Sequence, residues 1–433
     1  MRSLPTLALT ASVGVLGLAL APAATAATPD DSVAYLAAQL DAGGDRLTAE
    51  SGGQTFDDLG LTIDGILGMT AAGSGGDASA AATEYVVANA AGYHGSGEEV
   101  YASATAKMLT FASARGLDPR DVNGVDLVEQ LQSLEQDNGR FSDESEFGDY
   151  SNTLGQSFGL IGLERAGVNP STASVDRLLS QQCDDGGFFL DFPEEGEERK
   201  DCTSDPDATS LAIQALDAVG GQDSAVQDAA TFLEGHQDGD GGVGGGKTTE
   251  ASNANSTGLA AGAFALAGRD GARTRALGYL ETLTLGCDTP QMAGGIAYDR
   301  PSHDALVAKG ASARPDGITT RATAQALLGV SGQSYATVAS SEQAAATPST
   351  DCDTAATPAD PTDQNTPEPT EANPSGDAAS DASNAPARPG VVQTDGGTAA
   401  GSTAPLLLLG AGLGVLGAGS VMVLRRRPAT QRR

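Results

Sequence analysis

The stretch Gln-Cys-Asp-Asp-Gly-Gly-Phe at residues 182–188 decides the fold, because variants of it recur along the chain. Each variant follows an amphipathic segment and precedes an acidic loop, after which a Thr-led apolar segment begins. The clearest copies span residues 125–167, 175–220, 226–268 and 274–330. Self-similarity with a period of roughly 50 residues indicates one supersecondary unit that is stacked many times. A single unit cannot bury its apolar face, so neighbouring units must pack against one another.

The repeated unit is predicted to be a pair of helices. Leu211, Ala215, Leu216 and Val219 follow one stripe of a helix over residues 207–219. Before the clear copies, two more degenerate helix pairs are expected, because terminal repeats are usually atypical. They cover residues 33–40 with 59–73 and residues 82–91 with 100–116. The sequence therefore predicts six helix pairs.

The start of the helix over residues 207–219 carries short polar side chains. We expect Asp207 or Thr209 to cap this helix, because such side chains accept hydrogen bonds from the first free N–H groups. Asn152 and Asn255 are expected to play the matching part in neighbouring copies. The glycines at residues 220–221 are expected to end the helix.

The motif at residues 182–188 resembles the repeat of protein prenyltransferase β-subunits and of squalene and terpene cyclases. Residues 236–243 and, more loosely, residues 131–141 resemble it too. The resemblance implies an all-α fold, the α/α toroid, in which six inner helices surround a central cavity and six outer helices lie behind them. A fold hosts many activities, so the resemblance predicts the fold more strongly than the function.

The two ends of the chain predict export and anchoring. An apolar run followed by Ala-Thr-Ala at residues 24–26 is typical of a secretory signal. Residues 405–424 are uncharged and long enough to cross a membrane, and arginines follow at once. We expect a cell-surface protein held by this span, with covalent linkage to a cell wall as the alternative. The predicted parts are a signal peptide (1–26), the toroid (31–339), a disordered Ala/Thr/Pro/Asp-rich stalk (340–403), the membrane anchor (404–424) and a basic cytoplasmic tail (425–433).

The charge of the chain excludes one class of partner. With 24 basic and 57 acidic residues the formal net charge is −33. Such a chain repels polyanions, so a nucleic-acid partner is excluded.

The chain has four cysteines, which allow three pairings. In an oxidising compartment they should form two disulfides. Cys183 and Cys202 flank one acidic loop within one repeat, so we pair them, and Cys287 should then join Cys352. The three histidines lie far from any cysteine pair in sequence, so a zinc site is not expected.

Asp207 is the candidate catalytic residue. Asp-Pro-Asp-Ala-Thr at residues 205–209 resembles the Asp-x-Asp-Asp-Thr box of class II cyclases, whose middle acid protonates an alkene. Asp207 matches that acid. The acid that follows it in the box would tune the acidity of Asp207, but Ala208 stands there instead. The chain also has no Trp to line a cation cavity. We therefore expect no intact catalytic site; if the chain is an enzyme, the resemblance implies a cyclase or transferase.

Clustered acids raise the question of a metal. Asp238 and Asp240 resemble the start of a calcium loop, but Thr249 stands where that loop needs a glutamate. They are kept only as weak calcium candidates, and no cofactor is predicted.

Three functions remain open at this point. We favour a non-enzymatic module that binds a small molecule or a cell-surface partner; the secreted cobalamin carriers, which are disulfide-stapled α6/α6 rings, are similar to this arrangement. The first alternative is an enzyme of the cyclase or transferase type that uses Asp207 as its acid. The second is a surface protein for adhesion or wall organisation, in which the ring is a rigid head.

Overall fold

The computed structural model describes residues 28–51, 54–192, 202–246, 249–340, 345–349 and 352. The predicted signal peptide, membrane anchor and basic tail, and most of the predicted stalk, lie outside this part of the chain. Within it, no helix has both the length and the apolar composition that a membrane span needs.

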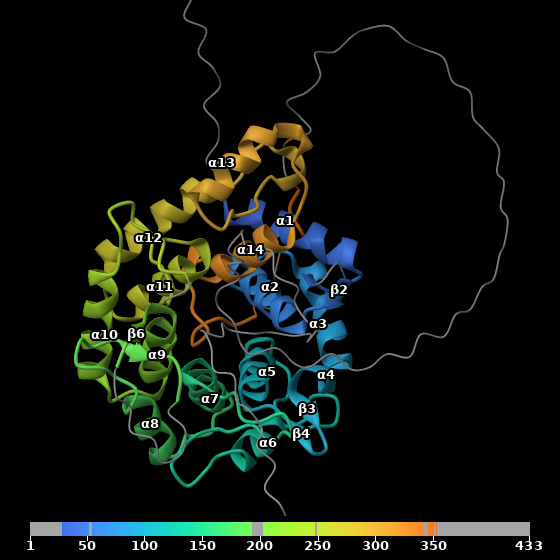
Figure 1. Cartoon of the computed structure of the whole chain (residues 1–433). Helices are drawn as coiled ribbons and strands as arrows, with labels where there is room; N and C mark the ends of the chain where they lie inside the picture. The colour runs from blue at the N-terminus through green and yellow to red at the C-terminus, as the bar shows by residue number, and fades with distance from the viewer. Residues whose placement is uncertain are drawn as a thin grey trace, which may run out of the picture.

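Six inner helices form a closed ring (Figure 1). Each contacts the next along the chain, and the last, α14, packs against the first, α2. Their interfaces hold most of the buried apolar side chains, which form one continuous core. The inner helices are α2 (Leu59–Ala72), α5 (Ala102–Ala114), α7 (Thr153–Arg165), α9 (Pro206–Val219), α11 (Ala254–Leu266) and α14 (Gly317–Val330).

Six outer helices alternate with the inner ones in sequence, so the predicted six pairs and the all-α toroid are confirmed. The two degenerate N-terminal pairs are α1 with α2 and α3 with α5. The outer helices are α1 (Pro29–Gly43), α3 (Gly76–Ala88), α6 (Leu127–Ser133), α8 (Thr172–Leu179), α10 (Asp223–Gly235) and α12 (Asp270–Leu283). Outside this scheme lie α4 (Ala91–His94), α13 (Arg300–Lys309) and the 3₁₀ turns η1 (Pro290–Met292) and η2 (Gly310–Ser312).

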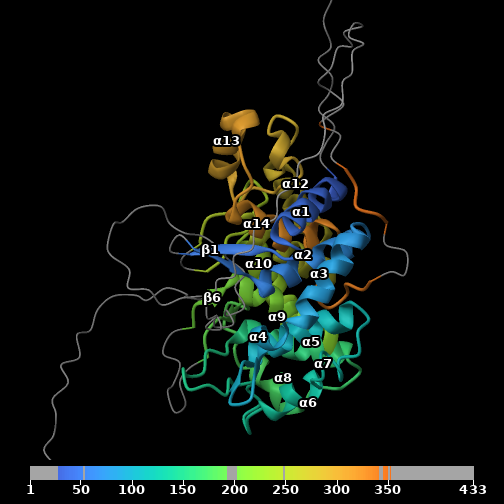
Figure 2. The same ribbon diagram turned by 90° about the vertical axis from the view of Figure 1, so that its right-hand side faces the viewer.

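Three short antiparallel ribbons lie among the loops that lead into inner helices. They are β1 (Thr48–Ser51) with β2 (Gln54–Asp57), β3 (Gly95–Ser96) with β4 (Glu99–Val100), and β5 (Phe188–Phe189) with β6 (Ser204–Asp205). In β5–β6, Phe188 pairs with Asp205, so the repeat motif is joined to the first residue before α9. Figure 2 shows β1 and β6 toward one side of the toroid and the orange chain that leaves α14 toward the other.

In the four clear copies, the repeat motif contacts the next outer helix around the ring. The Gln182 side-chain amide donates to the carbonyls of Gly186 and, in α10, Ala225, both at 2.9 Å. Gly186 has φ +92°, and a Cβ there would lie 2.5 Å from the carbonyl oxygen of Asp228 in α10. Glycine is needed because the turn has a left-handed conformation and lies directly against backbone.

The same contact closes the ring. Gly294, in the turn of the last repeat, has φ +85°, and a Cβ there would lie 2.0 Å from the carbonyl oxygen of Asp31 in α1. The Ser32 hydroxyl donates to the Gly294 carbonyl at 2.7 Å. The last motif therefore binds the first helix of the chain as the earlier motifs bind their successors.

The predicted cap of α9 is wrong by two positions. The side chain of Asp205 caps the helix and accepts from the Ala208 N–H at 2.9 Å. Asp207 is the second residue of the helix, and Thr209 instead accepts from the Phe188 N–H at 2.8 Å. Pro206 explains the shift, because proline is favoured in the first turn of a helix and moves the cap ahead of it.

The neighbouring helices α7 and α11 are capped at the position that matches Asp205, although neither begins with a proline. Asn152 does cap α7, but it is the counterpart of Asp205 rather than of Asp207. In α11 the cap is Asn253, so Asn255 matches Asp207 and the expected cap at Asn255 is wrong.

Both predicted disulfides are confirmed. Cys183 is bonded to Cys202, and Cys287 is bonded to Cys352. The second bond joins the segment after α12 to a residue well beyond α14.

Candidate functional site

Side chains from all six inner helices lie along one buried polar axis. Four of them are joined by an ion pair and hydrogen bonds, the Phe158 ring lies 5.8 Å from the Lys107 ammonium, and Gln214 is joined to the others through Tyr335. All six are at most 8 % exposed. We call these residues the axial cluster: Asp64, Lys107, Phe158, Gln214, Asn255 and Gln325.

An ion pair forms one side of the axial cluster. The Lys107 ammonium lies 2.6 Å from Asp64 Oδ1 and donates to the Gly60 carbonyl at 3.1 Å. The two side chains are only 4 % and 2 % exposed. A buried ion pair contributes no more to stability than well-packed apolar residues would, because both charges lose their hydration.

Amide side chains continue the axial cluster through α14 to α11. Gln325 donates to Asp64 Oδ2 at 3.2 Å and accepts from the Asn255 amide at 2.8 Å. Asn255 is 1 % exposed, and its Oδ1 has no hydrogen-bond partner within the part of the chain that the structure describes. Buried acceptors are nearly always bonded, so this atom can receive a donor from a ligand or a water molecule.

The chain that follows α14 enters the same axis. We call residues 331–340 the Tyr335 segment. The Tyr335 hydroxyl donates to Asp64 Oδ1 at 3.1 Å, and its N–H donates to Gln214 Oε1 at 2.9 Å. Its ring meets the edge of Phe158, with centroids 4.9 Å apart.

The backbone of the Tyr335 segment is held by α7 and α5. The Arg165 guanidinium donates to the carbonyls of Tyr335, Ala336 and Val338. Ser340 donates to the carbonyl of Ala114, the last residue of α5, at 2.8 Å. These contacts place the segment across the C-terminal ends of the inner helices.

Burial controls the protonation of groups around the axis. It raises the pKa of the Tyr335 phenol well above its ordinary value, and the charge of Asp64 adds to this effect. The Tyr335 phenol therefore stays protonated as a donor to Asp64 at physiological pH. Burial lowers the pKa of Arg165, whose donors are directed to carbonyl oxygens of the Tyr335 segment.

Asp207 lies on the same helix as Gln214, about two turns nearer the N-terminal end. It is 3 % exposed. A Cβ on Gly245 would lie 2.9 Å from Asp207 Oδ2, so the glycine-rich loop before α11 covers this carboxylate. Asp207 is therefore buried at the N-terminal end of α9, next to Gly245.

The weak calcium candidates bind the loop that precedes α11. Asp238 Oδ2 accepts from the Ser252 hydroxyl at 2.6 Å, and Asp240 Oδ1 accepts from the Gly242 N–H at 2.9 Å. Among the residues that the structure describes, no group of three or more His, Cys, Asp and Glu side chains could hold a metal ion.

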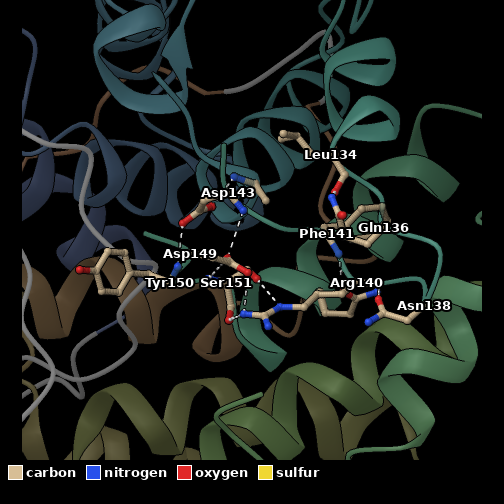
Figure 3. A network of polar contacts seen from close by, with 11 residues as sticks. Leu134, Gln136, Asn138, Arg140, Phe141, Asp143, Asp149, Tyr150 and Ser151 are labelled. Atoms are coloured by element: carbon tan, nitrogen blue, oxygen red, sulfur yellow. Dashed lines mark hydrogen bonds and ion pairs between the residues drawn. The ribbon is translucent and has the colours of Figure 1, made fainter. Parts of the chain in front are cut away.

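A second polar cluster lies in the acidic loop before α7 (Figure 3). Asp143 Oδ1 accepts from the N–H of Ala102 at 2.7 Å and Oδ2 accepts from Tyr150 at 3.0 Å. Tyr101, the residue just before α5, does not cap the helix with its side chain. Asp143 thus caps α5 from the neighbouring repeat, while Asp149 pairs with Arg140 at 2.8 Å.

The Asp143 cap predicts a pH effect on stability. Burial raises the pKa of Asp143 above its ordinary 3.8, although the two N–H donors oppose the effect. The native state therefore holds this proton more tightly than the unfolded chain, and the free energy of unfolding falls as pH rises through this range. Measured by urea unfolding between about pH 3.5 and 6, D143N should gain stability relative to the wild type as pH rises. E129Q, a change on the exposed face of α6, is the control; a wild-type-to-D143N difference that is flat or of opposite slope contradicts the prediction.

Sequence reasoning missed the axial cluster, although a signal for it was present. Asp64 is the only charged residue in α2, and Lys107 is the only one in α5. A lone charge in an apolar helix has to find a partner inside the protein. The partner is 43 residues away in sequence, so only the folded ring identifies it.

Comparisons with known proteins bear on the fold alone. No family model and no curated protein matches the chain. A crystal structure of a protein from Actinoplanes is 19 % identical, covers 70 % of this chain and 98 % of its own, and superposes with a TM-score of 0.50. The type II terpene cyclase MstE from Scytonema is 15 % identical, with coverages of 69 % and 97 % and a TM-score of 0.47. Haptocorrin in complex with Cbi is 12 % identical, with coverages of 73 % and 70 % and a TM-score of 0.43.

Proposed function

We propose that this chain is a non-enzymatic binding module, exported and displayed at the cell surface, which recognises a polar ligand along the axis of its toroid. The axial cluster is the observation that carries the proposal. Lys107 and Asp64 are charged groups buried beside the main apolar core of the ring. A ring that served only as a rigid head would be at least as stable with apolar residues there.

The chemistry of the axial cluster favours binding over turnover. It offers a carboxylate, an ammonium group and amides in fixed positions, and the Asn255 Oδ1 acceptor has no partner among the described residues. Such convergent polar groups set the orientation and specificity of a ligand. The two disulfides fit an oxidising compartment, which supports display outside the cell.

A ligand screen on the purified full-length chain tests the proposal. A ligand that binds the native state raises the melting temperature by mass action. We expect at least one polar metabolite or short peptide to raise the melting temperature of the wild type and to fail with N255A. S133A, a change on the exposed end of α6, is the control and should respond like the wild type.

A parallel assay tests the enzymatic alternative. The same chain is incubated with polyprenyl diphosphates and with squalene, and the products are analysed by mass spectrometry. We expect no product. Product formation by the wild type that is lost in D207N, a change that keeps the size of the side chain, would overturn the proposal.

A further inference from the structure

The Tyr335 segment contacts the toroid through polar groups directed at its backbone. Arg165 donates hydrogen bonds to the carbonyls of three residues of the segment, and Gln214 accepts a hydrogen bond from the Tyr335 N–H. The segment also packs against the main apolar core, in which Val338 is fully buried and Tyr335 is 7 % exposed. Backbone-directed donors and acceptors with a pocket for one side chain are how proteins bind peptides.

The toroid also leaves room for the backbone of the segment. A Cβ on Gly262 in α11 would lie 3.2 Å from the Gln333 carbonyl oxygen and 3.4 Å from Ser334 Cβ. Gly332, with φ +76°, reverses the chain after α14. The segment then folds into a turn in which the N–H of Ser334 donates to the Thr337 hydroxyl at 3.0 Å and Tyr335 projects to Asp64.

We propose that the C-terminal end of the axis is a peptide-binding site for a tyrosine presented on a short turn, and that the Tyr335 segment occupies this site as an intramolecular ligand. The inference rests on the proposed binding function and names the class of its ligand. Phe158 packs against the tyrosine ring and Asp64 accepts its hydroxyl. Arg165 and Gln214 bind the backbone on either side.

The way the segment is tethered supports this assignment. Beyond the segment, the backbone of Ala345 forms hydrogen bonds with the backbone of Gly73 and Gly76. Cys352 is joined to Cys287 by a disulfide. The segment is therefore held at both ends, which gives it a high effective concentration at the site. A ligand in trans competes with this tethered copy and binds only when the copy moves out.

A binding assay on the full-length chain tests the site. The probe is a fluorescent peptide with the sequence of residues 332–340, Gly-Gln-Ser-Tyr-Ala-Thr-Val-Ala-Ser. By fluorescence anisotropy it should bind Y335A at least tenfold more tightly than the wild type, whose own tyrosine competes. The double variant Y335A/R165Q should lose binding, and a probe with Phe in place of Tyr should bind more weakly.

Each other outcome of the assay is informative. A folded Y335A chain that does not bind the probe overturns the inference, and so does a Y335A chain that fails to fold, because the segment is then obligatory core. If a different polar ligand still raises the melting temperature in an Asn255-dependent way, the proposed function stands and only this inference fails.

Hydrogen exchange on the wild type provides a test without mutation. The N–H groups of Tyr335 and Ser340 should exchange through local opening, with protection at least tenfold lower than that of α7 and α9. Equal protection would show that the segment leaves only on global unfolding and would overturn the inference. Light scattering then tests one source of the peptide: a wild-type dimer that Y335A cannot form identifies a second copy of this chain, and a monomer at all concentrations excludes it.

Discussion

Lys107→Met should lower the free energy of unfolding by about 3–5 kcal/mol, because it leaves Asp64 buried without a cation. The Asp64 carboxylate would keep the neutral donors Tyr335 and Gln325. The methionine matches the length of the lysine, so the loss reports the charge more than the packing. Denaturant unfolding of the full-length chain, followed by circular dichroism, measures it.

An exposed ion pair provides the control. Arg120 lies 3.0 Å from Asp126, and the two side chains are 53 % and 25 % exposed. Arg120→Met should cost less than about 1 kcal/mol, because water screens such a pair. The double variant K107M/D64N should recover part of the loss, since it leaves no buried charge. If K107M and R120M lower the free energy of unfolding by the same amount, the burial of the Lys107–Asp64 pair does not have the expected effect.

Gly294→Ala should lower the free energy of unfolding by about 3–5 kcal/mol, adding the cost of a strained positive φ to that of a backbone clash. The new methyl group would lie 2.0 Å from the carbonyl oxygen of Asp31, so α1 must move away from the last repeat. Hydrogen exchange should show α1 losing protection while α7 and α9 keep theirs. That pattern would locate the damage at the closure of the ring.

Gly73→Ala is the matched control. Gly73 also has a positive φ, of +70°, but no atom lies within 4 Å of the position that its Cβ would take. It should therefore cost only about 1–2 kcal/mol. If G294A costs no more than G73A, the contact between the last turn and α1 does not hold the ring closed.

Much of the fold could be predicted because the information is local and repeated. The helix pairs follow from apolar spacing, and the turn glycines recur at the same place in each copy. The Cys183–Cys202 pairing followed from two residues on one loop. The cap of α9 was misplaced because Asp205, Asp207 and Thr209 are all good capping residues, and the choice among them depends on Pro206 and on pairing with Phe188.

The candidate site could not be predicted in the same way. Asp64 and Lys107 are brought together by the curvature of the ring, and Gln214, Asn255 and Gln325 are amides that look ordinary in their own helices. The Tyr335 segment has a composition that resembles the stalk after it, and nothing local marks it as buried.

The repeat alone determined that this chain folds into paired helices, since each pair needs a neighbour to cover its apolar face and the motif supplies the contact. The tertiary structure decided that the first and last pairs meet, because that depends on the sum of small rotations between pairs. It also decided what fills the centre. Polar side chains spread over some 270 residues converge there only after closure, when burial forces each to find a partner.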